Sequence, residues 1–192
     1  MIDILPEQIE KLANKIYNIN LNITEEMLLE RFVDRYRWPR YYIDPRYPTL
    51  ERLTETGEKV QDFFWDDGFL QTEKLIDYYN QGYTIIISGV QFLFNDITKI
   101  SDMLMKEFGR EINANCYLSK GTKCVSFPSH KHDYAVIIKN VFGKSEWEID
   151  SDHYLLENQN VFFIDKFKSH CVEKIHDRKC SLTFNLAPPG HL

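Results

Sequence analysis

The first third of the chain carries apolar residues at helical spacing. Between Pro6 and about Ile19, apolar side chains recur every three or four residues, which predicts an amphipathic helix. Thr24 precedes two glutamates and a second apolar face, a pattern typical of a helix N-terminus. A further short helix is predicted over Thr72–Asn80, so residues 1–82 are expected to form a helical N-terminal region.

The pattern changes at Tyr83. The run Tyr83–Ser88 is short, apolar and rich in β-branched residues, which predicts a buried strand. A helix with one apolar face then begins at Asn95 or Asp96, either of which is expected to cap it, and Gly109 is its predicted end.

Strand patterns dominate after Gly109. Short apolar runs are separated by Gly, Asp, Asn and Lys clusters, which is typical of a β-sandwich or barrel. The predicted strands are Asn113–Ser119, Lys123–Phe127, His130–Val141, Glu146–Ile149, Val161–Ile164 and Ser181–Leu186. We therefore expect a mainly β fold in which the helical region 1–82 packs on a barrel formed by residues 83–192, as one structural unit.

Composition narrows the class of partner. The 192 residues carry a net charge of −6, which argues against a nucleic-acid backbone as the main partner. No apolar run reaches the length of a membrane span, and the N-terminus lacks the pattern of a secretory signal.

We therefore expect a cytoplasmic protein in which the cysteines are reduced. The four cysteines form no CxxC pair; they are Cys116, Cys124, Cys171 and Cys180. An arginine-rich stretch is interpreted as a solvated or interface cluster, formed by Arg35, Arg37 and Arg40.

Three histidines have the spacing of a metal site. His130 and His132 are two residues apart on a predicted strand, so their side chains are expected to share one face, and a returning strand could bring His170 to the same point. Three convergent imidazoles predict a bound metal ion. Asp133 would face the opposite way on a regular strand and could replace His132 as a ligand only through a β-bulge. The other histidines, His153, His176 and His191, are expected on the surface.

Residues around these histidines follow the order of a known family pattern. Asn115-Cys-Tyr117, Gly121, His130-x-His132, Ala135–Ile138, Gly143 and Trp147 succeed one another with matching spacing, and Lys168-Ser-His170 and Ser181–Leu186 follow. In these features residues 60–187 resemble the JmjC-type cupins, in particular the bacterial branch related to ribosomal oxygenases. The resemblance implies a double-stranded β-helix that holds Fe(II) and uses 2-oxoglutarate and O₂ to hydroxylate a substrate.

The chain departs from that family pattern at two positions. His132 stands where the family has an acidic metal ligand, and Ser145 stands where it has a Lys or Arg that pairs with the far carboxylate of 2-oxoglutarate. Lys144 or Lys139 could supply the missing charge. The resemblance places Tyr117 and Asn185 among the polar groups of the pocket.

The resulting prediction is a mononuclear Fe(II)-dependent oxygenase that acts on a small molecule with O₂, with His130, His132 and His170 as metal ligands. The sequence leaves open whether another divalent metal takes the place of Fe(II) and whether 2-oxoglutarate is used. One alternative is a three-histidine dioxygenase whose substrate chelates the metal without 2-oxoglutarate. Another is a cupin that binds a metal or ligand without catalysis. No nucleic acid or membrane is expected as a partner, and a homodimer is a candidate assembly because such barrels commonly pair.

Overall fold

The computed structural model describes residues 6–33, 38, 48–109, 112–121, 123 and 125–186. The arginine cluster predicted around Arg37 lies outside the described residues, as do Cys124 and His191.

The helices are α1 (Pro6–Tyr17), α2 (Glu25–Val33), α3 (Thr72–Asn80), the 3₁₀ turn η1 (Val90–Phe92) and α4 (Asn95–Phe108). The strands are β1 (Thr49–Leu53), β2 (Lys59–Val60), β3 (Ile85–Ser88), β4 (Asn113–Lys120), β5 (Val136–Ile149), β6 (Asp152–Glu157), β7 (Val161–Ile164) and β8 (His170–Asn185). None of the described helices has the length and apolar character needed to cross a membrane.

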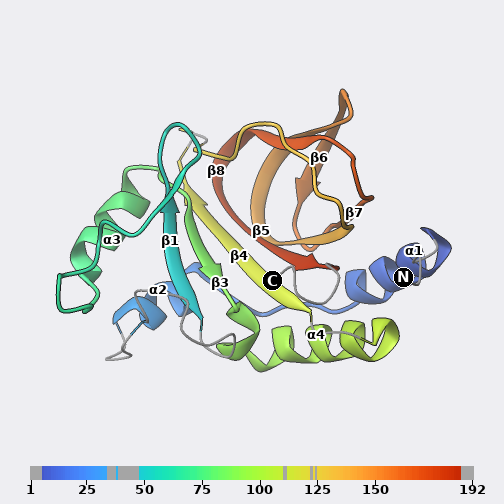
Figure 1. Cartoon of the computed structure of the whole chain (residues 1–192), viewed down its shortest axis with the longest axis horizontal. Coiled ribbons are helices and arrows are strands. Elements are labelled where there is room, and N and C mark those ends of the chain that lie inside the picture. Colours follow the sequence, from blue (N-terminus) through green and yellow to red (C-terminus); the bar gives the residue numbers. More distant parts are fainter. Residues whose placement is uncertain are drawn as a thin grey trace.

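The strands form one antiparallel sheet that curls on itself. Its order is β2-β1-β3-β4-β8-β5-β6, and β7 pairs with the first part of β5. Figure 1 shows β5 to β8 curling into a barrel beside the straighter strands β1, β3 and β4, with the helices on the outside. The predicted class, mainly β with a helical N-terminal part and a jelly-roll barrel, is confirmed by this arrangement.

Several strand boundaries differ from the predictions. β5 runs unbroken from Val136 to Ile149, because Gly143 at φ +80° forms an irregularity inside the strand and not a turn. β6 was not predicted; it follows a tight turn at Asp150 and Ser151, whose φ values of 50° and 72° are those of a type I′ hairpin. β1 and β2 lie within the region expected to be helical, and no strand forms over the described residues of 123–127.

The helix ends match the sequence signals in part. The hydroxyl of Thr24 accepts a hydrogen bond from the backbone N–H of Met27 at 3.2 Å, which confirms the predicted cap of α2. Gly109 ends α4 in the left-handed conformation, with its N–H bonded to the Met105 carbonyl at 2.8 Å, as predicted. The prediction for the start of α4 was wrong, because the capping position is Phe94 and no side-chain cap bond forms there.

The two faces of the main sheet have opposite character. The face covered by the helices is apolar and belongs to the largest core cluster, with Ile85, Ile87, Cys116, Leu118, Leu182 and Phe184. Each of these buried aliphatic or aromatic side chains contributes about 1.5–3 kcal/mol of transfer free energy. The alternate residues of β4 and β8, such as Asn115, Thr183 and Asn185, face the barrel interior and are polar. The largest core cluster therefore lies between the sheet and the helices, and a smaller cluster that includes Val136, Ile138 and Trp147 lies on the cavity side.

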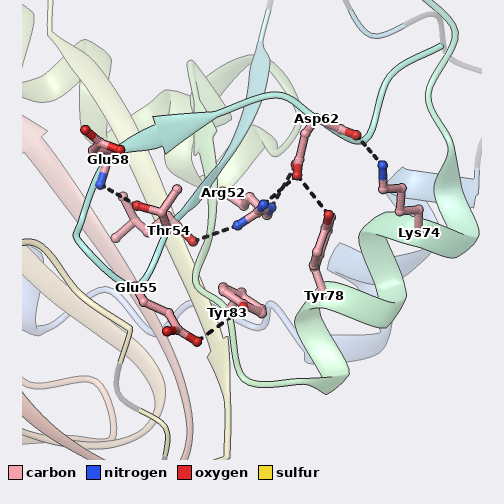
Figure 2. Close-up of polar contacts among 9 residues, drawn as sticks. Arg52, Thr54, Glu55, Glu58, Asp62, Lys74, Tyr78 and Tyr83 are labelled. Carbon is pink, nitrogen blue, oxygen red and sulfur yellow. Dashed lines mark hydrogen bonds and ion pairs between the residues drawn. The ribbon is translucent and has the colours of Figure 1, made fainter.

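Arg52 of β1 ties the β1–β2 hairpin to α3, as Figure 2 shows. Its guanidinium donates to both carboxylate oxygens of Asp62, at 2.8 and 2.5 Å, and lies 4.0 Å from the ring centre of Tyr78 and 5.0 Å from that of Tyr83. The Tyr78 hydroxyl donates to the same carboxylate at 2.8 Å. Burial alone would raise the pKa of Asp62, but the hydrogen bonds from Arg52 and Tyr78 hold it below its usual value. The network fixes one wall of the barrel against the helical layer.

Candidate metal centre

The imidazoles of His130, His132 and His170 lie together in the barrel. Their candidate ligand atoms are all within 4.8 Å of one another. The ring centres are 5.0 Å apart for His130 and His132, 4.5 Å for His130 and His170, and 5.3 Å for His132 and His170. Among the described residues, this cluster can hold a metal ion.

Backbone pairing brings the rings together. His130 forms an isolated antiparallel bridge with His170, the first residue of β8. The carbonyl of His132 accepts a hydrogen bond from the backbone N–H of Phe167 at 2.7 Å. This bond holds the backbone at His132 close to the segment that leads to His170. The predicted strand from His130 was wrong in its start, because β5 begins only at Val136. The convergence of His130 and His132 therefore comes from contacts to the 167–170 segment and not from strand alternation.

Hydrogen bonds orient two of the three rings. Nδ1 of His130 lies 2.8 Å from the carbonyl oxygen of Pro128, and Nδ1 of His170 lies 3.0 Å from that of Lys168. A carbonyl oxygen only accepts, so each Nδ1 carries the proton and donates. The lone pair of each neutral ring is then on Nε2. This is the usual arrangement of a metal-ligating histidine, whose second nitrogen is held by a backbone carbonyl or carboxylate.

The environment favours the neutral form of His132 and of His170. Burial, followed by electrostatic repulsion from neighbouring His130 and His170, lowers the pKa of His132 to about 4, and its ring stacks on that of Tyr134 with ring centres 4.8 Å apart. Burial also lowers the pKa of His170. Neutral imidazole is the form that binds a metal. Asp133, considered in place of His132, is exposed and is not part of the described histidine cluster.

The three histidines line a cavity of about 290 Å³ inside the barrel. Tyr117 and Asn185, predicted as pocket residues, both line it. Tyr117 packs edge-on against Phe127 with ring centres 6.2 Å apart, and burial raises the pKa of its hydroxyl. The volume of the cavity is near the lower end of the range for ligand sites, which is roughly 300–1,000 Å³.

The other three predicted binding residues do not line this cavity. Lys139 is fully buried on the outer face of β5, and its ammonium donates to the carbonyls of Ile16 and Gln159 at 3.1 and 3.2 Å. Lys144 lies at the surface, 3.5 Å from Glu157. Ser145 is buried but accepts a hydrogen bond from the indole N–H of Trp147 at 3.0 Å. These positions correct the expectation that one of the three contacts a ligand in the pocket.

Sequence reasoning missed Lys179. It lies on β8, is 4% exposed and lines the cavity. Its ammonium lies 4.8 Å from the ring centre of Trp147, a buried residue that also lines the cavity. Alternation counted back from Asn185 through Thr183 reaches Lys179 and would have found it.

Comparisons with known proteins find no matching family model and no matching curated protein. Similar solved structures include a cupin superfamily protein from Desulfitobacterium hafniense, at 13% identity and a TM-score of 0.37, covering 40% of this chain and 68% of that one. KdgF from Halomonas sp. matches at 17% identity and a TM-score of 0.36, covering 42% and 74%. Salicylate 1,2-dioxygenase from Pseudaminobacter salicylatoxidans matches at 7% identity and a TM-score of 0.35, covering 38% and 20%. Matches at this level carry no functional assignment, and the resemblance to JmjC-type cupins stays a sequence-based prediction.

Proposed function

We propose that this chain is a mononuclear metal enzyme that oxidises a small organic molecule with O₂, and that it holds Fe(II) through Nε2 of His130, His132 and His170. One observation carries the proposal. Two of the three rings donate Nδ1–H to backbone carbonyls, which leaves their Nε2 lone pairs for a metal, and one candidate ligand atom from each of the three rings lies within 4.8 Å of the other two. Histidines that only fill a core have no need of this shared orientation.

The spacing suits a single ion. Three nitrogens that bind one ion at about 2.1 Å lie roughly 3.0–3.4 Å apart at octahedral or tetrahedral angles. The three candidate ligand atoms, all within 4.8 Å of one another, would reach these separations through rotations of the side chains. Three imidazoles suit iron as well as zinc, copper or nickel. Bound Fe(II) would supply open coordination positions for O₂ and for a chelating ligand.

The chain's own residues would bind and orient the substrate beside that centre. Phe127, Tyr134 and Trp147 give the cavity aromatic walls that exclude water. Asn115, Thr183 and Asn185 offer hydrogen bonds from β4 and β8, strands whose other face is packed against the helices. Groups on rigid strands hold a ligand in one orientation, as hydroxylation of a chosen C–H bond requires.

The test compares metal content and turnover in histidine variants. Protein purified without oxygen and supplied with Fe(II) should bind one iron per chain, and His130→Ala, His132→Ala and His170→Ala should each lose most of it. His153→Ala is the matched control, because His153 is exposed and bonded to Glu173 at 2.7 Å. Unchanged iron content in the three site variants would exclude the proposal. Tightly bound zinc with no oxygen uptake would favour the non-catalytic cupin instead.

A dioxygenase that needs no 2-oxoglutarate is the second candidate. It is favoured by the positions of Ser145 and Lys144, since neither brings a charge to the cavity. Oxygen uptake and succinate release with 2-oxoglutarate as the sole addition would support the hydroxylase. Oxygen uptake only with a chelating substrate, and without succinate, would support the second candidate.

A further inference from the structure

The three rings of the candidate metal centre are not held in the same way. Backbone carbonyls accept Nδ1–H bonds from His130 and His170, at 2.8 and 3.0 Å. The ring of His132 makes no hydrogen bond to a described residue, and its contacts are with other rings. The end torsion of a histidine side chain has only broad preferences of its own. The plane of the His132 ring therefore depends on the rings around it.

Among the described residues, Tyr134 is the one whose ring lies parallel to that of His132. The two ring centres are 4.8 Å apart and the ring planes differ by 12°, which is the geometry of a stacked pair. The rings of His130 and His170 meet that of His132 at 79° and 52°. A parallel neighbour in contact opposes tilting of the imidazole more directly than an edge-on or tilted one. Tyr134 therefore restricts the orientation of the His132 ring.

Tyr134 is itself held in place by the barrel. It is partly buried and packs against the smaller core cluster on the cavity side, which includes Val136 and Ile138. Val136 is the first residue of β5 and pairs with Ile164 of β7 and Asn185 of β8. The tyrosine ring thus links the position of three paired strands to a histidine that lies outside the regular strands.

We propose that Tyr134 is the positioning residue of His132 and sets the plane in which this imidazole meets the metal. The assignment deepens the proposed function and rests on it for the metal, whereas the stack itself needs no ion. Two ligands of the centre are then oriented by the backbone and the third by a side chain. Because stacking uses the face of the ring, metal affinity should depend on an aromatic ring at position 134 and not on its hydroxyl.

NMR of the metal-free protein tests the stack. Protons over the face of an aromatic ring resonate upfield, so the carbon-bound ring protons of His132 should move downfield in Tyr134→Met and keep their wild-type positions in Tyr134→Phe. Nuclear Overhauser contacts between the two rings should be present in the wild type. The ring signals of His153, an exposed histidine bonded to Glu173, should be the same in all three proteins.

A Co(II) titration followed through the visible spectrum tests the effect on the metal. Tyr134→Met should bind Co(II) about tenfold or more weakly than the wild type, as expected when a group that orients a metal-ligating histidine is lost. Tyr134→Phe should bind it as the wild type does. Tyr154→Met is the matched control, because Tyr154 is an exposed tyrosine of β6 whose ring contacts Phe162.

The outcomes separate this assignment from the metal centre. Equal Co(II) affinity of wild type and Tyr134→Met, or equal losses in Tyr134→Met and Tyr134→Phe, would overturn the role of the ring. Absence of the Overhauser contacts in the wild type would overturn it even where a thermal melt shows that Tyr134→Met does not fold. Wild-type protein that binds no Co(II) would overturn the metal centre, while the NMR signals would still support or overturn the orientation of His132 by Tyr134.

Discussion

His130 and His170 exchange both of their backbone hydrogen bonds, with N···O distances of 3.2 and 2.8 Å. The pairing places the two side chains next to each other before any ion is considered. Each ring also bonds its Nδ1 to a carbonyl two residues earlier in its own segment. The backbone therefore sets both the position and the tautomer of the two imidazoles.

This geometry predicts which ring nitrogen of His130 and of His170 carries the proton in the metal-free protein. ¹⁵N NMR should show His130 and His170 as neutral Nδ1–H tautomers at mildly alkaline pH. His176 is an internal control, because its Nε2 lies 2.8 Å from a carboxylate oxygen of Glu146, which requires the Nε2–H tautomer. Finding Nε2–H on His130 or His170 would contradict the orientation on which the metal site depends.

Arg52→Lys should destabilise the fold although the charge is kept. Lysine cannot make the two-pronged contact to Asp62 or stack flat on Tyr78, so we expect a loss of about 1–2 kcal/mol in the free energy of unfolding. Urea denaturation measures the change. Lys59→Met is the comparison, since the Lys59–Glu51 pair is partly exposed to solvent and surface pairs contribute about 0–1 kcal/mol. Equal losses in the two variants would show that the Arg52 network has no special role.

Gly143→Ala should be far more damaging than Gly109→Ala. Both glycines have positive φ, at 80° and 65°, which costs alanine about 1–2 kcal/mol. A Cβ at Gly143 would also collide with the Arg178 carbonyl, whereas one at Gly109 meets nothing within 4 Å. We expect Gly143→Ala to lose about 3 kcal/mol or more in the free energy of unfolding. Similar values for the two variants would mean that β5 and β8 separate easily at this point.

Lys139 should make stability depend on alkaline pH. Burial lowers its pKa from the usual 10.5 to about 8. Between these values the unfolded chain binds more protons than the folded one, so this group raises the free energy of unfolding as pH increases across that window. The free energy of unfolding of the wild type minus that of Lys139→Met should therefore increase by up to about 1 kcal/mol per pH unit in that window.

Urea denaturation of both proteins from about pH 7 to about pH 10 measures the effect. Taking the difference between the two proteins cancels the titration of groups that they share. A difference that stays constant would show that Lys139 keeps an ordinary pKa in the folded protein, and one that falls as pH rises would show that its pKa is raised.

The sequence predicted features that depend on local chemistry. The Thr24 cap and the Gly109 helix end follow from single residues and their immediate neighbours, and both were found as predicted. The β-rich class followed from repeated short apolar runs. The closeness of His130, His132 and His170 was also anticipated, although the strand geometry given as its reason was wrong.

Side-chain directions on β5 could not be read from the sequence. Its ladder with β8 is irregular between Asn140 and Phe142, between Gly143 and Ser145, and between Glu146 and Trp147. Each irregularity shifts the alternation of faces, so counting in twos from His130 gives no reliable direction for Lys144 or Ser145. Lys179 was missed because the predicted last strand began only at Ser181, whereas β8 starts at His170, so the alternation of faces was not followed back to Lys179.

The division of the sheet into a helix-packed face and a cavity face has an evolutionary consequence. Residues such as Leu182 and Phe184 anchor the fold, while their immediate neighbours Thr183 and Asn185 touch whatever occupies the barrel. Exchanging the second set leaves the anchoring set in place. During evolution, substitutions at a few cavity-facing positions can therefore change which ligand the barrel binds while the residues that stabilise the fold stay the same.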